Sequence, residues 1–181
     1  SMSSDLLSFE NIVLKGVDMH QSISSSGIEG YAKVSIFNYD SIEFDNLSFS
    51  NIGKNGLLES RLTWDLRGSD NSELAWTTMV VDQSDLRFTI KPSFFSLKNY
   101  RWEITEESHL AVASNSLNID TLSLKRDSQG VKMYGCISNN DYDKLNLEVN
   151  NLNLDEMSEL LQSDIKIEGA LSGLTSVSNP Y

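Results

Sequence analysis

The sequence is poor in the residues that most often carry chemistry or covalent cross-links. It has one cysteine, two histidines and two prolines in 181 residues. A single cysteine, Cys136, excludes a disulfide within the chain, and neither His20 nor His109 belongs to a metal-binding motif such as HExxH. We therefore expect no cofactor, no metal and no enzymatic activity.

Basic charge and long apolar runs are also scarce. The chain has 14 lysines and arginines against 26 aspartates and glutamates, a formal net charge of −12. Because the basic residues are scattered and form no stripe, nucleic-acid binding is disfavoured. No apolar run approaches the roughly 18 residues that a transmembrane helix needs, so we expect no such helix in this stretch.

What the sequence does contain is a motif repeated four times: two apolar residues in alternation, two polar residues, and two more apolar residues in alternation. The copies are Leu7–Leu14, Ile42–Phe49, Leu117–Leu124 and Leu147–Leu154. Each half is typical of a strand with one apolar face. The central polar pair would turn the second half over unless a bulge or corner restores the face.

The central pairs are rich in residues that suit such a corner. Asn and Asp tolerate the left-handed conformation and bond their own backbone. We expect at least two of the four centres to lie at bulges or strand bends. The centres are Glu10-Asn11, Asp45-Asn46, Asp120-Thr121 and Asn150-Asn151.

The rest of the chain predicts an all-β fold. Strand-like segments recur along it, separated by turns of Gly, Ser, Asn and Asp. One short helix is predicted near 155–162, where Leu154, Met157, Leu160 and Leu161 form an apolar stripe. We predict an elongated, curved, antiparallel-rich sheet over residues 3–181, one β-rich segment of a longer protein, with Ser1-Met2 as an expression scar.

The repeated motifs and the strand predicted after the helix define one apolar face, which is the candidate site. The predicted lining residues are Leu7, Phe9, Ile42, Phe44, Leu47, Phe49, Leu117, Ile119, Leu122, Leu124, Leu147, Val149, Leu152, Leu154, Ile165 and Ile167. This face is either the core of a closed sandwich or the floor of an open trough for an apolar ligand. Periodicity does not separate the two.

The last part of the chain resembles the TamB/AsmA-like family. The resemblance lies in the strand Leu145–Leu154, the helical stretch Asp155–Gln162, and Ile165-Lys-Ile-Glu-Gly169-Ala-Leu171-Ser-Gly173, followed by Asn179-Pro180. The aromatic stretch Ser93–Ile104 before Leu117 is also similar to chains of this family. The resemblance covers roughly residues 90–180.

The resemblance implies a fold, a function and a location. The implied fold is a sheet bent lengthwise into a half-pipe, the β-taco. The implied function is that of a scaffold in the periplasm of a Gram-negative bacterium, anchored in the inner membrane by a part of the protein outside this chain. Phospholipid acyl chains would lie in the groove, and an Omp85-type outer-membrane barrel would be the protein partner. Its role would be phospholipid transport to the outer membrane, protein assembly in it, or both. The alternative is a structural or adhesive β-sandwich of the cell envelope with a closed core.

Overall fold

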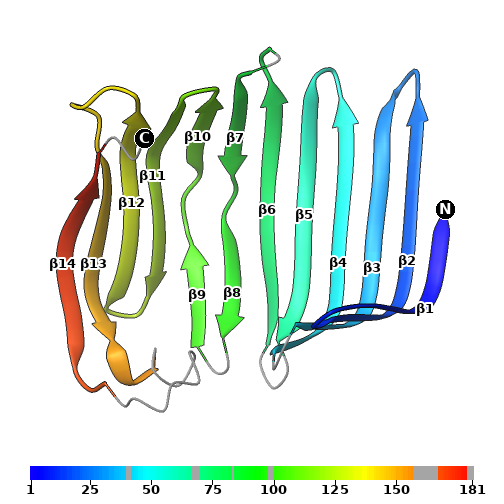
Figure 1. Cartoon of the computed structure of the whole chain (residues 1–181), viewed down its shortest axis with the longest axis horizontal. Helices are drawn as coiled ribbons and strands as arrows, with labels where there is room; N and C mark the ends of the chain where they lie inside the picture. Colours follow the sequence, from blue (N-terminus) through cyan, green and yellow to red (C-terminus); the bar gives the residue numbers. More distant parts are fainter. Residues whose placement is uncertain (40–41, 67–69, 83, 98–99, 157–166, 179–181) are drawn as a thin grey trace. The chain divides into compact units, whose positions relative to one another are not determined.

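A computed structural model describes the whole chain except residues 40–41, 67–69, 83, 98–99, 157–166 and 179–181 (Figure 1). The described residues form fourteen strands, and the paired strands run antiparallel. The predicted all-β, antiparallel class is therefore confirmed. Residues 154–156 are helical. The rest of the predicted helix, 157–162, lies outside the described residues.

The chain divides into two compact units. Unit 1 comprises Ser1–Met79 and Ser93–Arg101, and unit 2 comprises Val80–Pro92 and Trp102–Tyr181. The strands are β1 (Met2–Phe9), β2 (Ile12–Ser24), β3 (Gly27–Tyr39), β4 (Ile42–Lys54), β5 (Leu57–Leu66), β6 (Asn71–Val80), β7 (Leu86–Ile90), β8 (Ser93–Leu97), β9 (Tyr100–Ile104), β10 (Ser108–Ala113), β11 (Ser116–Arg126), β12 (Gln129–Ser138), β13 (Leu145–Asn153) and β14 (Ala170–Val177).

Unit 1 is an antiparallel meander in which β1 to β6 pair in sequence order, with β8 paired to β6. A line of interrupted pairing crosses its first four strands. By the register on either side, this line passes through Asp5, Gly16, Ser35 and Asn46. Gly16 and Asn46 adopt the left-handed conformation, with φ of 61° and 52°. Figure 1 shows the blue N-terminal strands turning sharply at the lower right of the view. We call the line of interrupted pairing the crease.

The crease keeps apolar residues on one face of the sheet. In β4, Asn46 and Leu47 lie opposite the single residue Trp64, because the register shifts between Asp45 and Ser48. Phe49 lies opposite Leu62 and Phe44 opposite Leu66. Since β5 alternates without interruption from Leu62 to Leu66, Phe44 and Phe49 point to the same side.

Two of the other predicted corners are also bulges. In β11 the register shifts between Ile119 and Leu122, and in β13 it shifts between Val149 and Leu152. Each shift sets two residues of one strand against one of its neighbour, which again returns the flanking apolar residues to one face. Asn151 has a φ of 49°, as expected of an Asn at a corner. The prediction of at least two bulges is confirmed.

The first motif does not form a bulged strand. Glu10 and Asn11 form a two-residue turn, β1 ends at Phe9, and β2 begins at Ile12, its direct partner. The apolar pattern is symmetric about its centre, so a hairpin places its residues on one face as well as a bulge does. The bend of β2 lies instead at Gly16, on the crease, two residues after the first motif ends at Leu14.

Unit 2 is built in the same way. Strand β10 pairs with β7 and β11, and β11 to β14 then pair in sequence order. The last three residues of β9 belong to this unit, and Glu103 pairs with Lys125 of β11. Strand β14 begins at Ala170, later than predicted, so Ile167 is described but lies outside any strand.

Candidate functional site: two apolar sheet faces

The apolar face of unit 1 consists of rows of directly opposed residues. One row crosses six strands and another, beyond the crease, crosses five. The rows are Met2, Met19, Ala32, Phe49, Leu62 and Leu74, and Leu7, Leu14, Phe37, Phe44 and Leu66. Directly opposed residues share a face, so the six predicted lining residues from Leu7 to Phe49 all lie on this apolar face.

The opposite face of unit 1 is mixed: it carries a charged and polar row, and also the exposed apolar residues Leu6, Ile52, Leu57 and Met79. Asp18, Lys33, Ser48, Thr63 and Glu73 form one row across it. On the same face, the phenol of Tyr31 donates a hydrogen bond of 3.2 Å to Asp18, and the ammonium of Lys33 lies 5.3 Å from its ring centre. The pKa of Tyr31 is raised by this hydrogen bond and by the charge of Asp18. The charged and polar residues of this row are thus confined to one face of unit 1, opposite the apolar rows.

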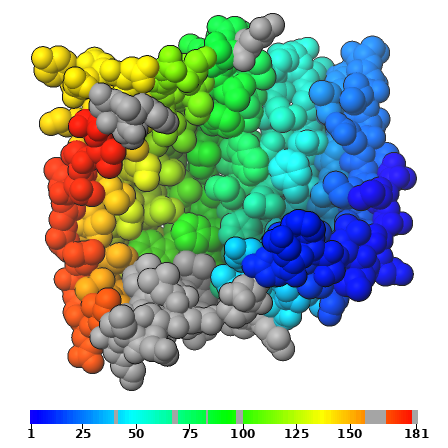
Figure 2. Space-filling model, viewed as in Figure 1, coloured from blue at the N-terminus to red at the C-terminus, as the bar shows by residue number. Residues whose placement is uncertain are grey.

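Exposure on the apolar face increases with distance from the crease. Along β2, Val17 is 4% exposed, Met19 41% and Ile23 72%. Along β1, in the other direction, Leu7 is 40% exposed and Phe9 69%. Apolar side chains next to the bend are thus buried, and large apolar side chains farther from the bend are exposed to solvent. In the space-filling view, the dark-blue N-terminal residues stand in front of the lower part of the cyan strands (Figure 2).

A groove lies on this open part of unit 1. It has a volume of about 460 Å³. Its lining residues are Ser1, Met2, Met19, His20, Gln21, Gly30, Tyr31, Ala32, Phe49 and Asn51. Phe49 in its floor stacks on Trp76, with ring centres 6.0 Å apart. This volume falls within the usual range of small-molecule sites, roughly 300–1,000 Å³.

The apolar face of unit 2 contains the second half of the predicted lining. Its rows join Leu110 to Ile119, Leu122 to Met133 and Leu147, and Leu124 to Val131 and Val149. The predicted residues Leu117, Ile119, Leu122, Leu124, Leu147, Val149 and Leu152 share this face. Leu154 lies in the helical residues, and Ile165 lies outside the described residues.

Burial differs between the two faces. In unit 2, Ile119 is 3% exposed, and Trp102 and Ile104 are also buried. In unit 1, Val17 is the buried apolar residue among those described. The apolar face of unit 1 is therefore the more open of the two.

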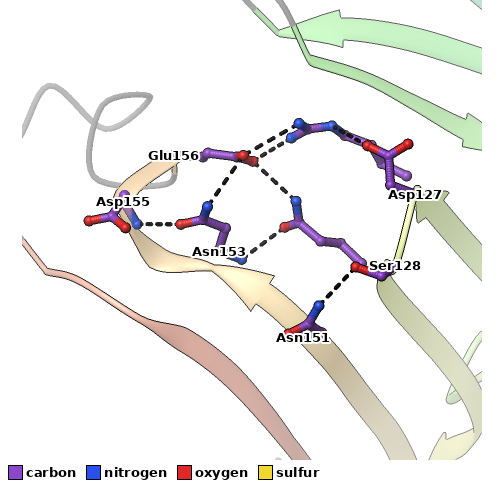
Figure 3. A network of polar contacts seen from close by, with 8 residues as sticks. Asp127, Ser128, Asn151, Asn153, Asp155 and Glu156 are labelled. Carbon is purple, nitrogen blue, oxygen red and sulfur yellow. Dashed lines mark hydrogen bonds and ion pairs between the residues drawn. The ribbon is translucent and has the colours of Figure 1, made fainter.

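A polar network bounds the apolar face of unit 2 (Figure 3). Arg126, at the end of β11, forms a two-pronged ion pair with Glu156, and both side chains are mostly buried, at 16% and 17% exposed. Gln129 also donates to Glu156, at 3.2 Å, and accepts from the backbone N–H of Asn153, at 2.8 Å. Asn153 caps the helical residues by accepting from the N–H of Asp155, at 2.9 Å.

The network sets the ionisation of Glu156. Burial by itself would raise its pKa, but the hydrogen bonds from Arg126, Gln129 and Asn153 and the charge of Arg126 outweigh burial, so the pKa of Glu156 is lowered. A carboxylate held in this way fixes residues 154–156 against the turn between β11 and β12. The sequence analysis did not find this network, because its members are brought together by strand pairing.

The remaining reactive residues lie outside the apolar faces. His20 packs against Tyr31 at 5.7 Å, and His109 Nδ1 lies 3.1 Å from the Thr89 hydroxyl. Burial and the neighbouring Asp143 raise the pKa of the Cys136 thiol. Within the described part of the chain, no three metal-binding side chains are clustered. The same residues include no helix long and apolar enough to span a membrane.

Comparison with known proteins found no match. No family model, no curated protein and no solved structure matches the chain.

Proposed function

We propose that the chain accepts the acyl chains of phospholipids on its apolar faces and acts as a scaffold for phospholipid transport to the outer membrane, for protein assembly in it, or both. The observation that carries the proposal is that most of the exposed large apolar side chains of unit 1 gather on one side of its sheet, among them Met19, Ile23 and Phe9. An amphipathic sheet normally buries that side against a second layer. Each buried methylene contributes about 0.8 kcal/mol, so an acyl chain lying on this surface is stabilised without any chemistry.

The position of the charged row supports the same proposal. The charged row of Asp18, Lys33 and Glu73 lies on the opposite face of unit 1 and favours contact of that side with water, while the apolar rows remain available to a ligand. The periplasmic location, the inner-membrane anchor and the Omp85-type barrel partner rest on the resemblance to TamB-type chains alone, and they belong to the proposal on that basis.

Position-specific crosslinking tests the proposal. A photoreactive amino acid is placed at Met19 or Leu147, on the apolar faces, and at Lys33 or Lys132, on the polar faces of the same strand pairs. The protein is mixed with vesicles of labelled phosphatidylethanolamine and phosphatidylglycerol and then irradiated. We expect labelled lipid at Met19 and Leu147 only. Equal labelling on both faces, or none at all, would contradict the proposal.

The closed structural sandwich is the second candidate, and the buried Ile119 favours it for unit 2. Crosslinking separates the two candidates unit by unit. Lipid captured at Met19 but not at Leu147 would place the conduit in unit 1 and leave unit 2 with a structural role.

A further inference from the structure

Strand β14 forms one edge of unit 2. It pairs with β13 on one side, and no other strand of the described residues pairs with it (Figure 1). All eight of its residues, Ala170–Val177, are exposed. The backbone N–H and C=O groups that face away from β13 are therefore open to pairing with a further strand.

The edge is held in position from the β13 side. The hydroxyl of Ser176 donates a hydrogen bond of 2.8 Å to Asn146 Oδ1, and the hydroxyl of Ser172 accepts one of 2.8 Å from the backbone N–H of Asn151. Both bonds fix β14 as an extended strand, so an added strand meets a preorganised template and loses less conformational freedom on pairing.

Strand β14 lacks the features that normally keep an edge strand from pairing. Natural sheet edges carry charges, especially lysine, or proline, or a bend. The sequence of β14 has no charged residue and no proline, and Leu171, Leu174 and Val177 are 46%, 62% and 50% exposed. The edge strand β1 of unit 1 differs, because it contains Asp5, which lies on the crease. Edge pairing is therefore expected at β14 rather than at β1.

The sequence of β14 is also self-complementary. In a symmetric antiparallel pair of identical strands, the two-fold axis passes through a residue that lies opposite its own copy, because opposed residues share a face. An axis at Leu174 sets apolar residues against apolar residues, whereas an axis at Gly173 or Thr175 would set Leu174 against a serine. With the axis at Leu174, the opposed pairs are Leu174 with Leu174, Leu171 with Val177, Ser172 with Ser176, and Gly173 with Thr175.

Charge favours a second copy at this edge over contact between copies elsewhere. The net charge of −12 makes two copies repel each other, but β14 adds no charge to a contact. The nearest acid across the pair is Glu148, which lies opposite Leu174 on β13. The two copies of Glu148 would be three strand spacings apart, roughly 14 Å, which exceeds the Debye length of about 8 Å at physiological salt.

We propose that two copies of the chain associate through their β14 strands, which pair antiparallel about a two-fold axis at Leu174. The inference goes beyond the proposed function, because it rests on the edge of the sheet and not on the apolar faces. Leu171 lies opposite Leu152, on the apolar face of unit 2. In the pair, this face would continue from Leu171 onto Val177 of the second copy.

Charge exchange at Leu174 tests the axis. Leu174→Glu and Leu174→Lys each remove the apolar pair and set like charges opposite each other, so each should weaken self-association about tenfold or more. An equimolar mixture of the two variants should associate again, because opposite charges then meet at the axis. Ile52→Lys is the matched control, since Ile52 is 58% exposed on the interior strand β4, and it should associate like wild type.

Analytical ultracentrifugation over a range of protein concentrations measures the association, and circular dichroism verifies that each variant is folded. The contact of one strand pair is small, so we expect a weak dimer that forms at high concentration. Wild type that stays monomeric throughout would overturn the proposal and leave the edge to a different strand, such as one from another part of a longer protein.

Three other results would also overturn it. Growth beyond the dimer would indicate pairing of β14 with β1, and a dimer that both Leu174 variants retain would lie elsewhere on the surface. Weakened association that the mixture does not restore would refute the axis at Leu174. None of these results depends on lipid capture at Met19, so this inference and the proposed function can fail independently.

Discussion

Truncating two apolar residues of the same strand should distinguish an open face from a closed core. Val17 and Ile23 both lie on β2 and on the same face, but Val17 is 4% exposed and Ile23 72%. We expect Val17→Ala to cost more than Ile23→Ala, although the isoleucine loses one more carbon atom. The free energy of unfolding is the quantity to compare.

The structure sets the size of the two effects. Val17→Ala removes two buried carbons at about 0.8 kcal/mol each and leaves a small cavity, so we expect a loss of about 2 kcal/mol. Fully burying an isoleucine contributes about 1.5–3 kcal/mol, and only about a quarter of this side chain is covered, so Ile23→Ala should cost about 0.5 kcal/mol.

Urea unfolding followed by tryptophan fluorescence measures both values, because Trp64 and Trp76 lie in unit 1. Ser22→Ala, at an exposed neighbour of Ile23 on the polar face, serves as the control and should be neutral. If Ile23→Ala costs as much as Val17→Ala or more, a layer of protein covers the face, and the open-groove reasoning is wrong.

Three further predictions concern the bends and the polar network. Asn46→Val should lose about 2 kcal/mol of unfolding free energy, because a β-branched residue at a φ of 52° is strained and the 2.8 Å hydrogen bond to Asp65 is lost. Asn46→Gly, which accepts this φ, should lose about 1 kcal/mol or less, so equal losses by thermal melting would show that strain is not the cause. Glu156→Gln should cost about 1–3 kcal/mol in urea unfolding because it leaves the mostly buried Arg126 without its anion, and a neutral result would mean that the pair does not hold the helical residues. The pKa of Glu156 is lowered on folding, so the stability that Glu156 contributes should be complete above pH 4.5, the ordinary pKa of a glutamate, and should disappear as the pH falls through the lower pKa of the folded state. Glu156→Gln should lack this loss of stability, and identical pH profiles of the two proteins would contradict the assignment.

The local sequence pattern predicted the fold class, and it predicted that the apolar residues of each motif share one face of the sheet. The period-two alternation in Ile42–Phe49 predicted a strand, and the Asp45-Asn46 centre predicted its bulge. Both follow from interactions within a few residues of the chain. The same is true of Val149 and Leu152, which the bulge at Asn150-Asn151 returns to one face.

Features that depend on strand register could not be predicted in this way. The pattern of Leu7–Leu14 fits a hairpin as well as a bulged strand, and only the pairing of Phe9 with Ile12 decides between them. The crease needs Gly16 and Asn46 to fall on one line across the sheet, although they lie far apart in the sequence. The facing of Gly30 and Asn51 in the groove has the same origin.

The crease and the continuous apolar face of unit 1 have one structural cause, the left-handed residues at the bend. In a regular strand, apolar residues that are three positions apart, such as Phe44 and Leu47 or Leu14 and Val17, would lie on opposite faces, because side chains alternate. Left-handed residues at Gly16 and Asn46 change the phase of the alternation at the bend, so the same apolar face continues on both sides of it. Next to the bend this face covers itself, as at Val17, and further away it remains exposed, as at Ile23. Under the proposed function, an acyl chain on this face would be most enclosed next to the crease, at Val17, and least enclosed towards Ile23 and Phe9.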